Sequence, residues 1–213
     1  MPRARSSTVT AIVGLAFVLL GAWLTTADRA DASVTVMLWL NDPPPPLNAV
    51  LAVTSPLLRP LPLGILMIVL GAWILVTAGN RVRRLEVVRA LVVAVVVSEV
   101  ISQVLKRVTA EPRPLSSIDG LDPHGYPGDP LGFAYPSAHT AVSVAVVCAL
   151  WPWLTRTQRV VGVIVATLIA ANRLYIGAHW PLDIAGGVAA GVVAGAFAWL
   201  VATRWPLRVT TAT

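Results

Sequence analysis

Two histidines and one aspartate have the types and spacing needed for nucleophilic attack assisted by acid–base chemistry. His179 and Asp183 are four residues apart, with Pro181 between them at the first position of an expected helix, so one helical turn would bring the carboxylate to the imidazole. A carboxylate on one ring nitrogen fixes the tautomer and leaves the lone pair of the other nitrogen free to attack phosphorus. His139 could then protonate the leaving oxygen as a general acid.

An anion site is expected around His139. The segment Pro136-Ser137-Ala138-His139 has the composition of a helix start, with Ser137 at or near the N-cap and the next two backbone N–H groups directed outward, where they attract an anion. Guanidinium forks match the tetrahedral oxygens of a phosphate. The cations that could complete such a site are Lys106, Arg113 and Arg173. Each arginine could instead anchor a helix end among lipid headgroups, the role that we assign to Arg29, Arg59 and Arg107.

Other polar residues leave two interpretations open. Glu99, Ser102 and Gln103 share one face of an expected helix with Lys106, by the three-and-four spacing of helical neighbours. They could form a polar path toward the phosphate site, or they could hydrogen-bond inside a helix bundle. The third histidine, His124, lies in a loop rich in proline and glycine, and we expect only a structural role for it.

The composition indicates the class of protein that carries these residues. Of the 213 residues, 56% are hydrophobic and only 12% are charged, and the mean hydropathy is +0.76, outside the range of soluble domains. A disordered chain is excluded by this hydrophobicity, and a disulfide-stapled secreted domain by the single cysteine, Cys148. The net charge of +6 comes from arginines flanking apolar segments, so no nucleic-acid partner is expected. We predict an integral membrane protein.

Six apolar stretches approach the roughly 20 residues that a helix needs to cross about 30 Å of hydrocarbon. They are residues 8–27, 61–79, 87–105, 138–155, 158–175 and 183–203. Because these runs are continuously apolar, they predict helices and not barrel strands. The expected fold is all-α, a six-transmembrane-helix bundle forming one membrane-embedded domain over residues 1–213. Arg3 and Arg5 before the first stretch, and Ala30-Asp31-Ala32 after it, also fit a cleaved signal peptide, and this alternative stays open.

The distribution of basic residues predicts that both termini are cytoplasmic. With the amino terminus inside, the cytoplasmic side of the plasma membrane holds ten of the sixteen basic residues, as the positive-inside rule requires. These are Arg3, Arg5, Arg81, Arg83, Arg84, Arg89, Arg156, Arg159, Arg204 and Arg208. The segments 106–114, 136–139 and 172–183, which hold the candidate site residues, then open on the extracytoplasmic face. Tryptophans near the expected helix ends fit interfacial anchoring; they are Trp23, Trp151, Trp153, Trp180 and Trp205.

Two long outer loops are expected between the spans. In residues 28–60, the run Pro43-Pro44-Pro45-Pro46 predicts a stiff extended stretch. Residues 106–136 are rich in proline and glycine, and a loop of this length usually carries function. In the last span, Gly187, Gly191 and Gly195 recur at every fourth position, which predicts close packing against a neighbouring helix.

Three fragments of the chain together resemble the signature of the type-2 phosphatidate phosphatase (lipid phosphate phosphatase) superfamily. They are Lys106 followed after six residues by Arg113-Pro114, then Pro136-Ser137-Ala138-His139, then Arg173 with His179 and Asp183. They cover residues 106–183, and three correctly spaced fragments in order are far more specific than one. Two positions depart from the pattern: Ala138 stands where the family most often has glycine, and Asn172 where it often has serine. Neither departure removes a reacting group.

The resemblance implies an integral-membrane lipid phosphatase. His179 would form a phosphohistidine, Asp183 would orient it, and His139 would protonate the departing group. The residues that would hold the phosphoryl oxygens are Lys106, Arg113, Ser137, the backbone of Ala138, and Arg173. No metal or other cofactor is implied, because the cationic cradle would supply the charge stabilisation.

The expected substrate is a lipid phosphate monoester or diphosphate. A polyprenyl diphosphate is favoured over phosphatidate and phosphatidylglycerol phosphate, because an outward-facing site suits a carrier lipid released outside the cell. Two alternatives remain: a phosphotransferase that uses another acceptor than water, and a non-catalytic lipid-phosphate transporter or binder. The latter would need no nucleophile, orienting carboxylate and acid at these spacings. Soluble vanadium haloperoxidases share the signature, but six apolar runs argue against them. The sequence does not indicate an oligomeric state.

Overall fold

The computed structural model describes residues 31–58, 81–125 and 132–204, together with a few isolated positions in the first two expected spans. Every regular element within these residues is a helix, in agreement with the all-α expectation. The expected spans 8–27 and 61–79 lie almost entirely outside the described residues, as do the possible signal peptide, Arg29 and Arg59. The number of membrane spans therefore stays a prediction.

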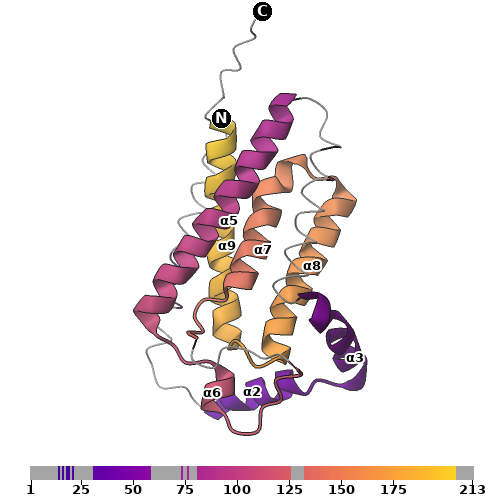
Figure 1. The fold of residues 1–213 in the computed structure, drawn as a ribbon, viewed down its shortest axis with the longest axis vertical. Coiled ribbons are helices and arrows are strands. Elements are labelled where there is room, and N and C mark those ends of the chain that lie inside the picture. Colours follow the sequence, from indigo (N-terminus) through magenta and orange to yellow (C-terminus); the bar gives the residue numbers. More distant parts are fainter. Residues whose placement is uncertain are drawn as a thin grey trace, which may run out of the picture.

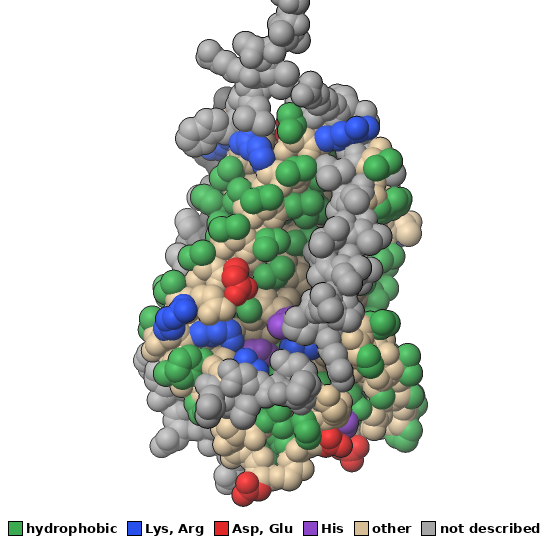
Figure 2. All heavy atoms as spheres, in the orientation of Figure 1, with side chains coloured by type: hydrophobic (Ala, Val, Ile, Leu, Met, Phe, Trp, Pro, Cys, Tyr) green, Lys and Arg blue, Asp and Glu red, His purple; other side chains and the backbone are tan. Residues whose placement is uncertain are grey.

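Four long helices run side by side along the long axis of the molecule (Figure 1). They are α5 (Arg81–Thr109), α7 (Ala138–Leu150), α8 (Arg156–Tyr175) and α9 (Pro181–Arg204). They occupy the last four expected spans, and α5 is longer than expected at both ends. Among the described residues, two helical stretches are long and apolar enough to cross a membrane: one within Arg83–Ser117, mostly α5, and α9. Apolar side chains cover much of the flank of this bundle (Figure 2).

Helix α7 is shorter than the expected span 138–155. It ends at Leu150 and is followed by the 3-10 helix η2 (Trp151–Trp153). Pro152 lacks a backbone N–H and so cannot donate the next hydrogen bond of the α-helix, which ends here. Helix α8 then begins with a reciprocal capping box, in which the side chains of Thr155 and Gln158 each accept a hydrogen bond from the other's backbone N–H.

The segment expected to be a proline-stiffened loop is largely helical. It contains α2 (Asp31–Asn41), α3 (Pro45–Thr54) and the 3-10 helix η1 (Ser55–Leu58). The expected extended stretch is wrong from Pro45 onward, because the last two prolines occupy the first turn of α3, where a missing N–H costs no hydrogen bond. In Figure 1, α2, α3 and the short α6 (Pro114–Ser117) gather at one end of the bundle.

Helices α7 and α9 meet along a seam of small residues, as the glycine repeat predicts. A Cβ atom on Gly191 would lie 2.6 Å from the carbonyl oxygen of Ala141, and one on Gly195 would lie 2.5 Å from the Cβ of Cys148. Only glycine permits backbones to approach this closely. Helix α5 packs against both helices, and the shared core is rich in alanine. The predicted role of these glycines in packing is confirmed.

Candidate active site

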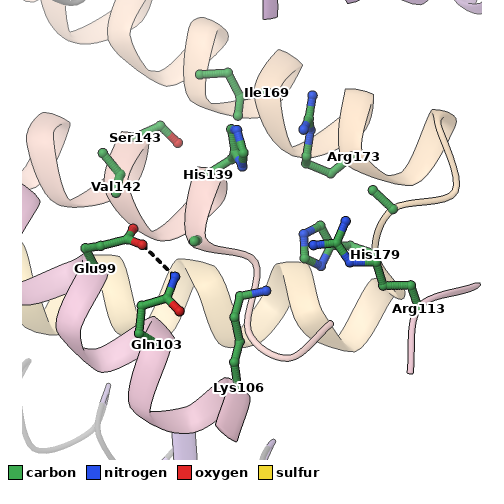
Figure 3. A pocket seen from close by; sticks show the side chains of 12 residues that line it. Glu99, Gln103, Lys106, Arg113, His139, Val142, Ser143, Ile169, Arg173 and His179 are labelled. Carbon is green, nitrogen blue, oxygen red and sulfur yellow. Dashed lines mark hydrogen bonds between the residues drawn. The ribbon is translucent and has the colours of Figure 1, made fainter. Parts of the chain in front are cut away.

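A cavity of about 330 Å³ opens between α5, α7, α8 and the loops that join them. Six of the eight site residues predicted from the sequence line it, although they come from three separate stretches of the chain (Figure 3). These six are Lys106, Arg113, Ala138, His139, Arg173 and His179. Ser137 and Asp183 are fully buried beside the cavity and do not line it. The fold thus gathers cations and two histidines around one space.

The start of α9 fixes His179 and Asp183 relative to each other. Pro181 is the first residue of the helix, as expected, and Asp183 lies in its first turn. The Oδ2 atom of Asp183 accepts a hydrogen bond of 2.7 Å from the backbone N–H of Trp180, as a side chain at this position does in a capping box. The same Oδ2 atom lies 3.4 Å from Nδ1 of His179. This contact is longer than a charge-assisted hydrogen bond.

The start of α7 is tied directly to the start of α9. Ser137 is the N-cap residue of α7, as expected, and its backbone N–H donates to the carbonyl oxygen of Asp183 at 3.0 Å. Its hydroxyl does not cap the helix or reach the cavity; it accepts a hydrogen bond of 3.1 Å from Thr140. The predicted anion-binding helix start is therefore presented by Ala138 and His139, without the side chain of Ser137.

Lys106 and Arg113 hold the loop that precedes α7. The Nζ atom of Lys106 donates to the carbonyl oxygen of Phe133 at 2.6 Å, and Nε of Arg113 donates to that of Gly132 at 3.0 Å. A Cβ atom on Gly132 would lie 2.9 Å from the Arg113 guanidinium, so a larger residue there would displace the guanidinium. Both cations line the cavity while they are anchored to the backbone behind it.

Arg173 is fixed from an unexpected direction. Its Nη2 atom donates to the Asn172 side chain at 2.8 Å and to the carbonyl oxygen of Leu58 in η1 at 3.3 Å. Arg173 is only 2% exposed, yet it lines the cavity (Figure 3). Sequence reasoning placed residues 28–60 on the outer surface, without any part in the site. No local pattern signals a contact between residues 115 positions apart.

The environment of His179 keeps its imidazole neutral. Burial lowers the pKa of His179 well below its ordinary value of 6.5, and the neighbouring charges of Lys106, Arg113 and Arg173 lower this pKa further. A hydrogen bond with the backbone of Ala134 acts in the opposite direction and is the weaker influence. A neutral imidazole retains the lone pair that nucleophilic attack needs.

Two polar residues whose role the sequence left undecided lie in the same cavity. Glu99 and Gln103 line it from α5, and the Gln103 amide donates to the Glu99 carboxylate at 2.7 Å (Figure 3). Ser102, which shares their helix face, instead donates to the carbonyl oxygen of Ser98 within α5 and is fully buried. Hydrogen bonding inside the bundle thus holds for Ser102, whereas a polar path through Glu99 and Gln103 stays a prediction.

Trp180 is a structural residue that sequence reasoning missed. It was expected to anchor the protein at a membrane interface, but it is only 2% exposed, and its indole N–H donates to the carbonyl oxygen of Pro112 at 2.9 Å. That bond ties the loop carrying Arg113 to the start of α9. His124, in contrast, lies outside the cavity and stacks on Tyr175 with ring centroids 3.7 Å apart.

The family follows from a comparison with known proteins. The sequence matches the family model of the PAP2 superfamily over residues 87–206, more than half of the chain. The chain belongs to the PAP2 superfamily. The resemblance inferred from three motifs is thereby confirmed. The matched region of this PAP2 protein contains α7, α8, α9 and most of α5, and with them every residue of the signature.

One curated relative shows a closer similarity in sequence. An undecaprenyl-diphosphatase from Sulfolobus acidocaldarius is 32% identical to this PAP2 protein over 128 residues. The match covers 54% of this chain and 56% of that relative, so the two align over little more than half of the relative's length.

Two solved structures share the fold. The crystal structure of Aquifex aeolicus LpxE has a TM-score of 0.64 at 22% identity and covers 80% of this chain and 96% of its own. A transmembrane PAP2-type phosphatidylglycerolphosphate phosphatase from Bacillus subtilis has a TM-score of 0.63 at 18% identity and covers 89% of this chain and 94% of its own. The chain therefore shares its fold with both of these proteins.

Proposed function

We propose that this PAP2 protein is a metal-independent lipid phosphatase of the plasma membrane, with its active site on the extracytoplasmic face. The observation that carries this proposal is the single cavity shared by Lys106, Arg113, Arg173, His139 and His179. The substrate is a lipid phosphate monoester or diphosphate. The likeness to an undecaprenyl-diphosphatase supports a polyprenyl diphosphate as the favoured substrate, ahead of phosphatidate and phosphatidylglycerol phosphate.

The proposed reaction proceeds in two displacements. The lone pair of His179 attacks phosphorus, the bond from phosphorus to the leaving oxygen breaks, and His139 gives that oxygen a proton. Asp183 holds the imidazole in the reactive tautomer and stabilises the positive charge that develops on it. His139, now neutral, takes a proton from a water molecule that attacks the phosphohistidine. The phosphorus–nitrogen bond then breaks, and inorganic phosphate leaves.

The cations stabilise the charge that develops on the phosphoryl oxygens. Lys106, Arg113 and Arg173 line the cavity together with the start of α7, and donors fixed in advance are worth more in a low-dielectric site than in water. Lys106 and Arg113 are anchored by backbone carbonyls, and Arg173 by a carbonyl and the Asn172 amide. Because the cradle is already cationic, we propose that no metal ion or other cofactor takes part.

The decisive experiment measures phosphate release by purified, detergent-solubilised protein. Polyprenyl diphosphate, phosphatidate and phosphatidylglycerol phosphate are compared as substrates. His179→Ala should lower the rate by roughly 10⁴-fold or more, because the nucleophile is lost. His124→Ala is the matched control and should keep most of the activity, because His124 lies outside the cavity. Near-normal hydrolysis by His179→Ala would defeat the proposal.

The same assay tests whether the reaction needs a metal ion and whether water is the acceptor of the phosphoryl group. Orthovanadate should inhibit, because it mimics five-coordinate phosphorus, and chelators should leave the rate unchanged. A strict requirement for added magnesium would contradict a metal-independent reaction. Offering lipid and sugar alcohols to the labelled phosphohistidine distinguishes a phosphatase, which releases inorganic phosphate, from a phosphotransferase, which forms a new phosphoester.

A further inference from the structure

The proposed active-site cavity contains polar side chains that the reaction described above does not use. Glu99 and Gln103 line it from α5. Glu99 lies seven residues before Lys106 on the same helix, or about 10 Å along the helix axis. Figure 3 shows Glu99 and Gln103 on one side of the cavity, His179 on the opposite side, and His139 between them. The two unused side chains thus lie away from the proposed nucleophile.

In-line displacement gives this side of the cavity a defined part in the reaction. If His179 attacks phosphorus from one side, the leaving oxygen departs on the opposite side. The water that later attacks the phosphohistidine must arrive on that same opposite side, since the phosphorus–nitrogen bond is now the one that breaks. His139 serves both steps and lies between His179 and the Glu99–Gln103 pair. The pair is therefore on the side from which water attacks.

A water molecule in this position needs two hydrogen-bond acceptors. Its lone pair is directed at phosphorus, so each of its two O–H groups must find another atom. His139, neutral after the first displacement, accepts one of them. The cationic side chains and the backbone N–H groups at the start of α7 can only donate, and the phosphoryl oxygens already accept from these donors. The second O–H requires an acceptor elsewhere in the cavity.

The described lining residues supply that acceptor on the side opposite His179. The Gln103 amide donates to Oε1 of Glu99 at 2.7 Å, which leaves Oε2 of Glu99 and the carbonyl oxygen of Gln103 to accept from a guest. Ser143 also lines the cavity, and its hydroxyl donates to the carbonyl oxygen of Thr140 at 3.0 Å. These three oxygens require a guest that donates hydrogen bonds, which a fully ionised phosphate or a hydrocarbon cannot do.

The place of Glu99 in the bundle also points to water. Glu99 lies inside the expected span 87–105 and is half-buried. Among the described residues, its side chain is hydrogen-bonded to the neutral amide of Gln103 and not to a cation. An ionisable side chain within a span faces either a charged partner or a water-filled cavity, because burying a carboxylate without either is costly. Glu99 therefore indicates that this side of the cavity holds water.

We propose that Glu99 and Gln103 position the water molecule that hydrolyses the phosphohistidine, a role that rests on the proposed function. As the bond from the water oxygen to phosphorus forms, the bond from phosphorus to His179 breaks and one water proton passes to His139. The second O–H donates to the Glu99–Gln103 pair throughout, and its proton stays on the phosphate that leaves. Neither side chain takes a proton, so both are positioning residues.

Competition between water and methanol tests this role. Methanol has only one O–H, so its attack needs His139 but no second acceptor. Purified protein is given farnesyl diphosphate or dioctanoyl phosphatidate, each labelled with radioactive phosphorus at the terminal phosphate, in buffer that contains methanol. The measured quantity is the ratio of methyl phosphate to inorganic phosphate. Both products arise from the same phosphohistidine, so the rate of the first displacement does not affect this ratio.

The variants of the pair should change this ratio in a fixed order. Glu99→Ala should raise it roughly 10- to 100-fold, because water loses a hydrogen bond to a charged group and methanol loses none. Gln103→Ala should raise it by a smaller factor, because a neutral acceptor is removed. Glu99→Gln keeps an acceptor oxygen of the same shape and should hold the ratio within about fivefold of the wild-type value.

Ser102→Ala is the matched control on the same helix. Ser102 is fully buried and donates to the carbonyl oxygen of Ser98 within α5, so its loss disturbs the helix without removing an acceptor from the cavity. It should keep the wild-type ratio. A merely structural disturbance by Glu99→Ala would lower the overall rate and leave the ratio unchanged.

Several results would overturn the water site. An unchanged ratio in Glu99→Ala would do so, as would an equal change in Ser102→Ala. If Glu99→Gln behaves like Glu99→Ala, the charge of Glu99 matters and not its hydrogen bond to water, which also refutes the assignment. A wild-type protein that forms neither product from either substrate refutes the proposed function itself. Wild-type release of phosphate with a ratio insensitive to Glu99 refutes the water site alone.

Discussion

At the scale of single residues, one oxygen of Asp183 connects the catalytic chemistry to the folding of α9. Its Oδ2 atom accepts the N–H of Trp180 at the helix start and faces Nδ1 of His179. The carboxylate is therefore held by the backbone before any substrate binds. An orienting group fixed in this way holds the tautomer of the imidazole without a separate network of side chains.

Asp183→Asn tests this arrangement. An amide at this position can present its N–H to Nδ1 and impose the wrong tautomer, so kcat should fall by roughly 10³ to 10⁴-fold with little change in KM. Steady-state phosphate release checks the prediction. Asp122→Asn serves as the matched control, because the Asp122 carboxylate is 67% exposed and contacts His124 outside the cavity. Wild-type kcat in Asp183→Asn would show that the carboxylate does not orient the nucleophile.

The depressed pKa of His179 predicts how stability depends on pH. In the unfolded chain His179 binds a proton below pH 6.5, whereas the folded protein keeps it neutral to well below that value. The unfolded state thus binds more protons in this range, and the stability present above pH 6.5 is progressively lost as the pH falls. The unfolding temperature of the wild-type protein should decrease more than that of His179→Gln between about pH 7 and about pH 5. Parallel curves for the two proteins would contradict the predicted pKa.

At the scale of elements, the glycine seam sets how close the two helix starts can come. A Cβ atom on Gly187 would lie 2.7 Å from the carbonyl oxygen of Ser137 and 2.9 Å from the Cβ of Thr140. These contacts lie one turn or less from His139, while α9 carries Asp183 one turn before Gly187. The absence of a side chain at Gly187 therefore lets the start of α7, which carries His139, lie close to the first turns of α9, which carry Asp183.

Gly187→Ala should cost about 1–3 kcal/mol of stability through overpacking. It should also lower kcat/KM by up to about 100-fold, because a displacement of about 1 Å at the reacting groups is enough for such a loss. Gly195→Ala is the matched control at the far end of the seam, where the added Cβ would meet Cys148 and Ala145. It should lose similar stability in thermal unfolding while keeping its activity. Equal losses of activity in both variants would mean that the seam stabilises the bundle without positioning the site.

At the scale of the whole molecule, the basic residues define two ends. Lys and Arg side chains gather near one end of the bundle and again around the histidines closer to the other, with an apolar flank between them (Figure 2). This pattern agrees with a protein that crosses a bilayer and opens its active site toward one aqueous face. The predicted orientation places that site outside the cell.

Cysteine labelling tests this orientation. Ser117→Cys lies in α6 near the active-site end, and Thr203→Cys lies at the opposite end of α9; both positions are exposed. A membrane-impermeant maleimide applied to intact cells should modify Ser117→Cys and spare Thr203→Cys, and inverted vesicles should give the reverse. The wild-type protein, with its single Cys148 within α7, controls for background labelling. Modification of Thr203→Cys alone in intact cells would show that the protein has the opposite orientation in the membrane.

The sequence by itself determined which residues could react, because chemical roles follow from residue type and from spacing within one helical turn. His179, Pro181 and Asp183 illustrate this, as do the N-cap position of Ser137 and the glycine repeat of α9. The same local information also identified the family and the helical fold. It mispredicted the position of Trp180, which is buried and not at a membrane interface, and the conformation of the last two prolines, which begin α3 and are not extended.

Only the tertiary structure decided which atoms face the common cavity and which merely support it. It turned the Ser137 hydroxyl away from the cavity and brought the carbonyl of Leu58 to Arg173. These features depend on contacts between residues that are far apart in the chain, or on the direction in which a buried side chain points. Neither periodicity nor spacing along the sequence encodes them, because both are settled only when the helices pack against one another.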